Sequence, residues 1–307
     1  MALLARERPL ITIILLCYNH ENFVADAVGG VLSQTYSPLE IIIFDDCSGD
    51  RTTEVVERTI AEHPRRPDVR FIRNPENLGS NAVVRAALSM AKGELIFVSH
   101  GDDVMLADMV EEMALVWSEQ GVSLVTANAY YIDDKSQPLN RTFRDPDQPA
   151  DDSFETLARD GANDCCFGPA IGFERRIYER FDWVPRYLRA YDIMYPFYAY
   201  LERGAKFISK PLLKYRLHGG NTSLSLQLER SNSPEKYLLQ ERMYIGHIAH
   251  ATLMEEVLDR LRIEEPERYG PIAERIMPLL TIQLSETAKK LARLSRQSGT
   301  LASELRR

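Results

Sequence analysis

Two pairs of adjacent aspartates, Asp45–Asp46 and Asp102–Asp103, each follow an apolar run of the chain. Adjacent carboxylates suit Mg²⁺ or Mn²⁺, which take oxygen ligands, commonly one or two carboxylates completed by phosphate and water. Acidic residues also occur at helix starts, where a carboxylate interacts favourably with the helix dipole. Asp103 would serve a helix that starts near residue 105 in this way, so the pair alone leaves both interpretations open.

The first pair lies in a polar run that continues through Ser48 and Asp50 and precedes Thr52. Side chains of Ser and Asp accept hydrogen bonds from the free N–H groups at a helix start, so capping is an alternative to ligand binding. We expect a division of labour in which one aspartate of the pair reaches a ligand while Ser48 or Asp50 caps the following helix.

Short apolar runs rich in β-branched residues precede these clusters, and such runs are typical of strands buried on both faces of a parallel sheet. The predicted strands are Leu10–Cys17, Leu39–Phe44, Val69–Ile72 and Glu94–Val98. The sequence between them predicts helices over 23–34, 52–61 and 80–92. Alternating strands and helices predict an α/β fold with a mostly parallel central sheet flanked by helices.

Ligands bind at the carboxyl ends of the strands in sheets of this kind. Three polar clusters fall at predicted strand ends: Asn19–Glu21, Asp45–Asp50 and His100–Asp103. Their coincidence, rather than any single pair, predicts a crevice lined by acids and amides.

The pattern loosens after residue 135. Residues 136–165 are rich in Asp, Pro, Gln and Asn and are predicted to form a long loop or irregular insertion. The elements expected after it are a strand over Gly168–Phe173, helices over Arg175–Phe181 and Asp192–Arg203, and short strands at Phe207–Ile208 and Leu212–Leu213.

The last part of the chain is predicted to be helical, starting at Ser233–Pro234–Glu235. It carries a heptad stripe, with basic residues close by, made of Met277, Leu280, Leu284, Thr287, Leu291, Leu294, Ser298, Leu301 and Leu305. Such a stripe fits docking on the chain's own domain, the seam of a homo-oligomer, or contact with a membrane surface.

Composition excludes several classes of protein. The chain has 307 residues, a net charge of −8 and 45% hydrophobic residues, values of an ordinary globular protein whose acidity argues against general nucleic-acid binding. Cys17, Cys47, Cys165 and Cys166 form no CxxC motif, so reduced thiols are expected. We see no cleavage site or membrane-spanning run, and expect a cytoplasmic protein, with a peripheral place at the inner face of the plasma membrane as the alternative.

The order of the polar clusters resembles that of inverting glycosyltransferases of family 2, which have the nucleotide-diphospho-sugar transferase fold called GT-A. The matching stretches are 11–52, 74–103 and 191–223. They contain, in the family's order, a strand followed by YN, then SQT, DDxSxD, NLG, AKGE, xDD, an acid before an apolar helix, and YRxHxxxxS. The last 80 or so residues have no such match.

The resemblance implies roles for the acids and for the tyrosine. Tyr18 and Glu21 would lie near the base and ribose, and Asp46 would accept from the N3–H of uracil or thymine. Asp102 would hold Mg²⁺ or Mn²⁺ against the diphosphate, and Asp103 would support it or touch the sugar.

Two later positions match catalytic or metal-binding positions of the family. Asp192 would be the base that deprotonates an acceptor hydroxyl, although an N-cap for the following helix is the alternative. His218 would contact the metal or diphosphate, although a simple loop histidine is equally compatible with the sequence.

The sequence departs from the family pattern at three positions. His100 replaces the first acid of the DxD motif, Leu16 replaces a proline, and Arg85 stands where many members have asparagine. His100 still offers an imidazole ligand but puts the ribose contact and the strength of metal binding in doubt. Arg85 either contacts phosphate or lies on a solvated helix face.

These observations together predict a GT-A domain over 1–223, with a nucleotide-binding half (1–103) and an acceptor half (104–223), and a helical extension over 224–307. The predicted function is metal-dependent transfer of a sugar from a UDP- or dTDP-sugar to a saccharide or lipid-linked saccharide acceptor, in cell-surface polysaccharide or glycan assembly. The alternative is a catalytically degraded nucleotide-sugar-binding or scaffold protein that acts through its helical tail. His100 favours the alternative, while the retained acids at 46, 102, 103 and 192 favour the enzyme.

Overall fold

The computed structural model describes residues 8–61, 63–148, 153–161, 168–181, 191–221 and 235–304. The chain divides into two compact units. The first comprises Met1–Asp152 and Cys166–Leu217, and the second comprises Ser153–Cys165 and His218–Arg307. The predicted domain boundary, at residue 223, differs from this division, which also assigns residues 153–165 to the second unit.

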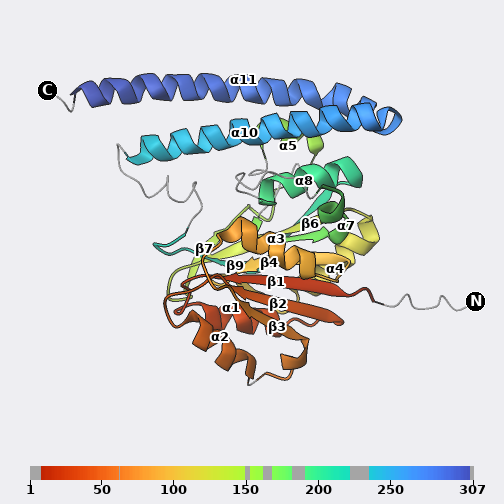
Figure 1. Cartoon of the computed structure of the whole chain (residues 1–307), viewed down its shortest axis with the longest axis vertical. Coiled ribbons are helices and arrows are strands. Elements are labelled where there is room, and N and C mark those ends of the chain that lie inside the picture. Colours follow the sequence, from red (N-terminus) through yellow and green to blue (C-terminus); the bar gives the residue numbers. More distant parts are fainter. Residues whose placement is uncertain are drawn as a thin grey trace, which may run out of the picture. The chain divides into compact units, whose positions relative to one another are not determined.

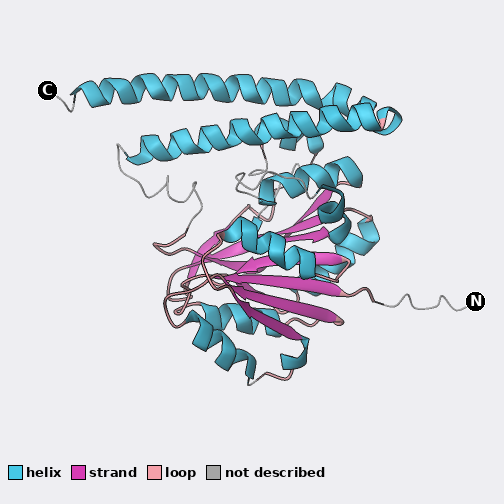
Figure 2. Ribbon diagram, in the orientation of Figure 1, coloured by secondary structure: helices cyan, strands magenta, loops and turns pink. Residues whose placement is uncertain are grey.

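One sheet runs through the first unit, and within the described residues it has nine strands (Figure 2). Their order is β3-β2-β1-β4-β8-β6-β9-β5, with β7 paired to β6. The parallel neighbours at one side are β1 (Ile11–Cys17), β2 (Leu39–Asp45), β3 (Val69–Arg73) and β4 (Leu95–His100). The mostly parallel sheet predicted from the sequence is confirmed.

The other side of the sheet mixes directions. The strand β8 (Ile171–Glu174) runs antiparallel to both β4 and β6 (Leu124–Ile132), so β4 and β6 point the same way. The strand β9 (Ala205–Arg216) is parallel to β6, while β5 (Val104–Met105) and β7 (Pro138–Thr142) are antiparallel to their neighbours. The carboxyl ends of β1, β2, β3, β4, β6 and β9 therefore share one edge.

Helices cover both faces of the sheet. Every residue of β1 is buried, as expected for a strand packed on both faces. The helices α1 (Val24–Leu32), α2 (Thr52–Ala61) and α4 (Met109–Gln120) contribute to one core with alternate residues of the strands. The helix α3 (Ser80–Met90) lies against β1 and β2 on the side opposite α1 and α2 (Figure 1).

The buried side chain of Gln34, from the SQT motif, fixes the end of α1. Its amide nitrogen donates to the carbonyls of Gly30 (2.9 Å) and Leu106 (2.7 Å), and its oxygen accepts from the N–H of Val110 (3.0 Å). All three bonds are buried or partly buried, so Gln34 ties α1 to the segment that enters α4.

Gly93, from the AKGE motif, allows the turn before β4 to pack directly on β1. A Cβ atom at this position would lie 2.4 Å from the main-chain nitrogen of Thr12. The N–H of Gly93 donates to Thr12 Oγ1 (2.8 Å), which in turn donates to Glu40 Oε2 (2.7 Å). Glycine is required here because the approach is between two main chains.

The described part of residues 136–165 is not one long loop, so that alternative of the prediction was wrong. The edge strand β7 and the helix α5 (Phe154–Asp160) both lie in this stretch. Most of β7 is exposed, so no apolar alternation marks it in the sequence. A local signal exists for α5, because Ser153 Oγ accepts from the N–H of Thr156 (3.2 Å) as an N-cap.

One long strand, β9, replaces the two short strands predicted at 207–208 and 212–213. Pro211 interrupts the apolar pattern, and proline is disfavoured within a sheet. The register of β9 against β6 shifts on either side of Asn128, the partner of Pro211. This bulge accommodates the proline and lets pairing continue to Arg216.

Aromatic stacking holds the helices near β8. The helix α7 (Arg175–Phe181) stacks Phe181 on Tyr198 of α8 (Tyr191–Glu202), with ring centroids 4.4 Å apart. Phe173 of β8 stacks on Tyr195 at 4.5 Å. Gly204 follows α8 with φ 88°, the left-handed conformation predicted for a helix-ending glycine.

The second unit is built from α5 and two long helices, α10 (Glu235–Glu264) and α11 (Pro266–Glu304). The stripe predicted on α11 packs along α10, with Leu280, Thr287 and Leu294 buried. An ion pair between Arg275 and Glu155 (2.8 Å) ties α11 to α5. The part of the stripe from Leu280 to Leu294 therefore packs within its own chain.

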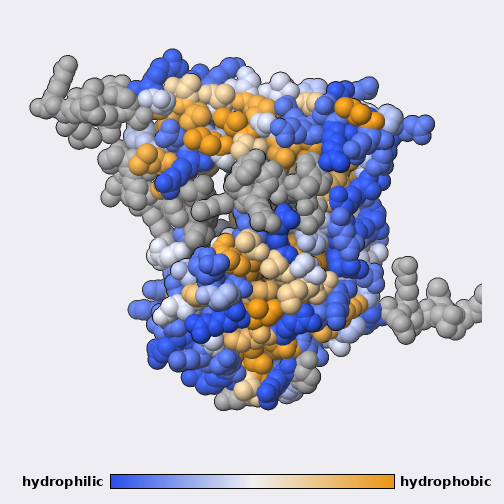
Figure 3. Space-filling model, in the orientation of Figure 1, coloured by the Kyte–Doolittle hydropathy of each residue, from blue (hydrophilic) through white to orange (hydrophobic). Residues whose placement is uncertain are grey.

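Apolar side chains remain exposed on the long helices, and Figure 3 shows apolar surface along them. Leu238 and Ile245 of α10 are 61% and 52% exposed, and Ile282 of α11 is 49% exposed. Across the described residues, no helix is both long enough and apolar enough to span a membrane.

Candidate functional site

The loops after β1, β2, β3 and β4 meet at the common carboxyl edge of the sheet, because these strands are parallel neighbours. The turn after β6 and the end of β9 reach the same edge. Two of the three predicted polar clusters, at 19–21 and 45–50, are joined by hydrogen bonds. The third, at 100–103, follows β4, which pairs with β1.

The loop after β1 is bonded to the loop after β2 at several points. Asn19, in the left-handed conformation with φ 54°, donates its N–H to Ser48 Oγ (2.9 Å) and accepts from the N–H of Gly49 (2.9 Å). Glu21 donates its N–H to Asp50 Oδ2 (3.1 Å). Tyr18 precedes this network and is 46% exposed, so its ring is open to a ligand.

Glu21, predicted to lie near the base and ribose, has one carboxylate oxygen engaged. Its Oε2 accepts from Nε of Arg51 (3.0 Å) and from the main-chain N–H of the same residue (3.2 Å). The other oxygen, Oε1, takes no part in these two bonds.

The capping part of the predicted division of labour is confirmed in the second loop. Asp50 Oδ1 accepts from the N–H of Thr52 (2.9 Å), the first residue of α2, and so caps that helix. Asp45 is fully buried and accepts from the N–H (3.1 Å) and hydroxyl of Ser48 and from Thr53 Oγ1 (3.0 Å). Asp45 therefore shapes the loop after β2.

Asp46 holds the loop that contains the NLG motif. Its Oδ1 accepts from Asn74 Nδ2 (2.9 Å) and from the N–H of Leu78 (2.9 Å), and its Oδ2 accepts from the N–H of Gly79 (2.8 Å). A carboxylate has about four acceptor positions. Three are occupied, so one position remains on Oδ2, on a residue that is 6% exposed.

The two residues of the second acidic pair, Asp102 and Asp103, differ in burial. Asp103 is 2% exposed, and its Oδ1 accepts from the main-chain N–H of Arg216 (3.0 Å). Asp102 is half-buried, and its carbonyl accepts from Nε of Arg216 (2.9 Å). Burial raises the pKa of Asp103 well above its usual value, and Asp102 raises it further, while Arg216 opposes both effects. Asp102 is thus the more accessible carboxylate.

The helix predicted to start near residue 105 does not start there. The short strand β5 follows Asp103, and α4 begins at Met109. Helix capping therefore does not explain the second acidic pair.

His100 and Arg85 remain compatible with their predicted roles. His100 is the last residue of β4 and is half-buried. The next residue, Gly101, packs against His20, and a Cβ at Gly101 would lie 2.6 Å from Nδ1 of His20. Arg85 is half-buried on α3, the helix that follows the loop held by Asp46. His100 thus lies at the same strand end as Asp102.

The structure describes the two candidates from the later motifs, Asp192 and His218, to different extents. Asp192 is the second residue of α8, but its side chain lies outside the described residues. His218 begins the second unit, where its Nδ1 accepts from the N–H of Gly220 (3.2 Å) and its own N–H donates to Asn221 Oδ1 (2.7 Å). Cys165 and Cys166 lie outside the described residues.

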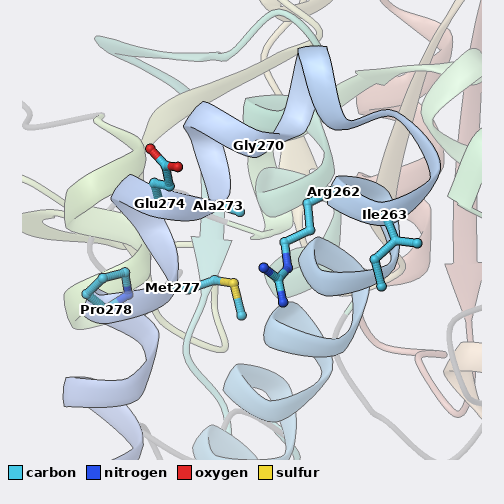
Figure 4. A pocket seen from close by; sticks show the side chains of 7 residues that line it. All are labelled: Arg262, Ile263, Gly270, Ala273, Glu274, Met277 and Pro278. Carbon is cyan, nitrogen blue, oxygen red and sulfur yellow. The ribbon is translucent and has the colours of Figure 1, made fainter.

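A separate cavity of about 440 Å³ lies where α10 turns into α11 (Figure 4). Arg262, Met277 and Pro278 are among its lining residues, and none of the catalytic, nucleotide-binding or metal-binding residues predicted from the sequence lines it. Within the described part of the chain, no group of three His, Cys, Asp or Glu side chains is arranged to hold a metal ion.

Sequence reasoning assigned no role to three residues that build the site. Asn74 and Gly79 hold the carboxylate of Asp46, and the buried Arg216 contacts both members of the second acidic pair. The NLG and YRxH motifs contain Gly79 and Arg216, so the motifs carried the signal without indicating what each residue contacts.

Residues 12–181 match the family model described as glycosyl transferase family 2. The chain belongs to glycosyl transferase family 2. This span includes the loops that carry Tyr18, Asp46 and Asp102, and it covers more than half of the chain. The predicted family and the predicted enzyme class, a glycosyltransferase, are confirmed.

Individual relatives agree with the family. The uncharacterized glycosyltransferase alr2836 of Nostoc sp. is 25% identical over 231 residues, which cover 74% of this chain and 70% of that protein. A crystal structure of S. aureus TarS 1-349 with UDP-GlcNAc has a TM-score of 0.59 at 14% identity, over 96% of this glycosyltransferase and 91% of that TarS 1-349 chain. The Pyrobaculum calidifontis mannosyltransferase PcManGT, with GDP-Man and Mn²⁺, has a TM-score of 0.53 at 18% identity, with coverages of 93% and 87%. At these identities both structures support the fold alone.

Proposed function

We propose that this glycosyltransferase moves a sugar from a UDP- or dTDP-sugar to an acceptor hydroxyl, with inversion at the anomeric carbon. The observation that carries the choice of nucleotide is the single acceptor position left on Asp46. Uracil and thymine present one N–H, N3–H, between two carbonyls. Guanine presents N1–H and an adjacent amino group, which pair best with two free carboxylate oxygens. Asp46 therefore favours uracil or thymine.

The donor diphosphate would lie near the end of β4, with a divalent cation. Asp102 offers one half-buried carboxylate there, with the imidazole of His100 two residues earlier. One carboxylate completed by phosphate oxygens and water is a common ligand set for Mg²⁺, and Mn²⁺ accepts the same oxygens. The donor chemistry of these residues thus fits the cation. When bound, the cation would neutralise the charge that develops on the departing nucleoside diphosphate.

Asp192 is the residue we propose as general base. An acceptor hydroxyl is a weak nucleophile until a positioned carboxylate takes its proton. Asp192 lies in the first turn of α8, just before the apolar part of that helix, where its sequence motif predicts the base. Direct attack of the deprotonated hydroxyl on the anomeric carbon inverts its configuration.

The proposed acceptor is a saccharide or lipid-linked saccharide in cell-surface glycan assembly. TarS and PcManGT are described with UDP-GlcNAc and GDP-Man, so proteins of this fold use more than one nucleotide. By its position in the YRxHxxxxS motif, His218 is proposed as a further metal or phosphate contact.

Calorimetric titration of the full chain tests the donor and cation assignments. We expect UDP to bind at least tenfold more tightly with Mn²⁺ than with EDTA, and GDP to bind more weakly than UDP. Asp102→Ala should remove the gain from Mn²⁺, because it removes the accessible carboxylate. Glu57→Ala, which removes an exposed acid on α2, is the matched control and should keep the gain.

Transfer assays with UDP- and dTDP-sugars then test the base. Asp192→Asn should bind UDP as the wild type does and lose about 10²- to 10⁴-fold in kcat, the range for a missing general base. Unchanged kcat in this variant would remove Asp192 from the mechanism. A failure of the wild type to bind any nucleotide would favour a scaffold role through the C-terminal helices.

A further inference from the structure

Arg216, the last residue of β9, is only 1% exposed. It belongs to the YRxH motif, but the proposed reaction gives it no role. Burying a guanidinium is strongly unfavourable unless its donors are satisfied. Its partners therefore indicate what the residue is for.

The side chain of Arg216 donates to three segments of the first unit. Nε donates to the carbonyl of Asp102 (2.9 Å), and Nη1 donates to Ser136 Oγ (2.7 Å) and to the carbonyl of Asp133 (3.3 Å). Nη2 donates to Asp26 Oδ2 (3.1 Å), in the first turn of α1. The planar guanidinium supplies donors in a fixed fork, which lets one side chain join these segments.

The main chain of Arg216 completes the contact with the acidic pair. Its N–H donates to Asp103 Oδ1 (3.0 Å), which keeps that carboxylate inside the protein. The guanidinium meanwhile holds the carbonyl of Asp102. The two adjacent carboxylates are thereby given different environments, with Asp103 buried and Asp102 half-buried.

We infer that Arg216 is a positioning residue that fixes the main chain at Asp102 and keeps Asp103 buried, so that the carboxylate of Asp102 alone is presented to the donor diphosphate and its cation. This inference rests on the proposed function, because it assumes a cation at Asp102. The residue acts through Asp102 and does not contact the donor.

Ser136 and Asp26 hold the far side of the guanidinium. Ser136 Oγ accepts from Arg216 Nη1 and donates to Asp26 Oδ2 (3.0 Å). Asp26 is 54% exposed in its side chain, so it supplies negative charge from the surface. Loss of the Ser136 hydroxyl should loosen the guanidinium without touching the acidic pair.

The test is the affinity of the full chain for Mn²⁺ in the presence of UDP, measured by calorimetry, with UDP affinity in EDTA as the second readout. Arg216→Lys keeps the positive charge, but a single ammonium nitrogen replaces the planar guanidinium and its fixed set of N–H donors. We expect it to weaken Mn²⁺ binding about 10- to 100-fold, the range for partners that orient a metal ligand. UDP affinity in EDTA should change less than about twofold.

Arg65→Lys is the matched control for loss of a guanidinium. Arg65 donates from Nη2 to the carbonyls of Gln34 (2.7 Å) and Tyr36 (3.1 Å), remote in sequence from the acidic pair. This variant should lose stability but keep the affinity for Mn²⁺.

Ser136→Gly keeps the proposal testable if Arg216→Lys does not fold. Ser136 has φ 63°, a conformation that glycine adopts without strain, so this variant removes the hydroxyl and little else. We expect Mn²⁺ affinity to fall about three- to tenfold, in line with the loss of one hydrogen bond.

Unchanged Mn²⁺ affinity in Ser136→Gly and in folded Arg216→Lys would overturn the inference, as would an equal loss in Arg65→Lys. If the wild type itself binds no Mn²⁺ in the presence of UDP, the proposed function fails and the positioning role falls with it. The wild-type titration therefore separates the two failures.

Discussion

Replacing Asp46 with asparagine tests whether this carboxylate recognises the base of the donor. Asparagine has nearly the same shape, but its NH₂ group replaces one acceptor oxygen. The remaining oxygen is expected to stay with Asn74 Nδ2 and the N–H of Leu78, since two donors converge there. The NH₂ group would then face the N–H of Gly79 and the N3–H of the base, both of which are donors.

The magnitude follows from these contacts. A hydrogen bond to a charged group contributes about 1.5–3 kcal/mol, and a buried donor left without a partner costs about 1–3 kcal/mol. At about 1.4 kcal/mol for each factor of ten, UDP affinity should fall roughly 10- to 150-fold. The free energy of unfolding should fall by about 1–3 kcal/mol, because the N–H of Gly79 loses its acceptor.

The assay pairs UDP titration with urea unfolding, and Gly79→Ala separates the two effects. Gly79 has φ 79°, and a Cβ there meets nothing within 4 Å, so alanine strains the loop without a clash. Strain of this kind costs about 1–3 kcal/mol, similar to the loss in Asp46→Asn, but it leaves the Asp46 carboxylate intact. Equal losses of UDP affinity in the two variants would refute the direct contact and leave only a role in holding the loop.

Two further variants test the fold. Gly93→Ala should lower the free energy of unfolding by at least about 2 kcal/mol, because the new Cβ would lie 2.4 Å from the main-chain nitrogen of Thr12. Gly29→Ala in α1, with nothing within 4 Å of its Cβ, is the control and should be neutral or slightly stabilising in urea unfolding. Burial lowers the pKa of His247 on α10, and His250 and Lys290 lower it further. Because the folded helices then bind fewer protons than the unfolded chain, their stability should be complete above pH 6.5 and decline as the pH falls through the folded pKa. Thermal melts followed by circular dichroism at pH 7.5 and 5.0 should show a smaller acid shift in His247→Gln, and an identical shift would rule out this residue as the cause.

The sequence was sufficient for the parallel side of the sheet, from β1 to β4. The runs at 10–17, 39–44 and 94–98 are mostly apolar and rich in β-branched residues, as is typical of a strand covered on both faces. Because parallel strands end at a common edge, the positions of the polar clusters at 19–21, 45–50 and 100–103 followed from the strands themselves.

Other elements depended on partners that are distant in sequence. Exposed β7 exists because β6 offers it an edge, and β9 continues through Pro211 because a bulge against Asn128 absorbs the break. A sequence pattern indicates a strand by alternating apolar residues and the end of a strand by a proline. The strand β7 lacks the alternation and β9 contains the proline, so the sequence analysis missed β7 and divided β9 in two. The sequence predicted the apolar face of α11 but not its partner. Only the structure shows that α10 packs along this helix.

The sequence by itself determined the family, the central strands and the edge where the acids gather, because these follow from local periodicity and from motifs in a fixed order. It did not distinguish Asp102 from Asp103, nor Asp45 from Asp46, by their environments. Those distinctions come from hydrogen bonds with Arg216, Ser48 and the loop at 74–79, which the chain brings together only on folding. Tertiary structure decided these distinctions because the burial of a carboxylate and the positions of its hydrogen-bond donors exist only in the folded protein, whereas residue type is given by the sequence.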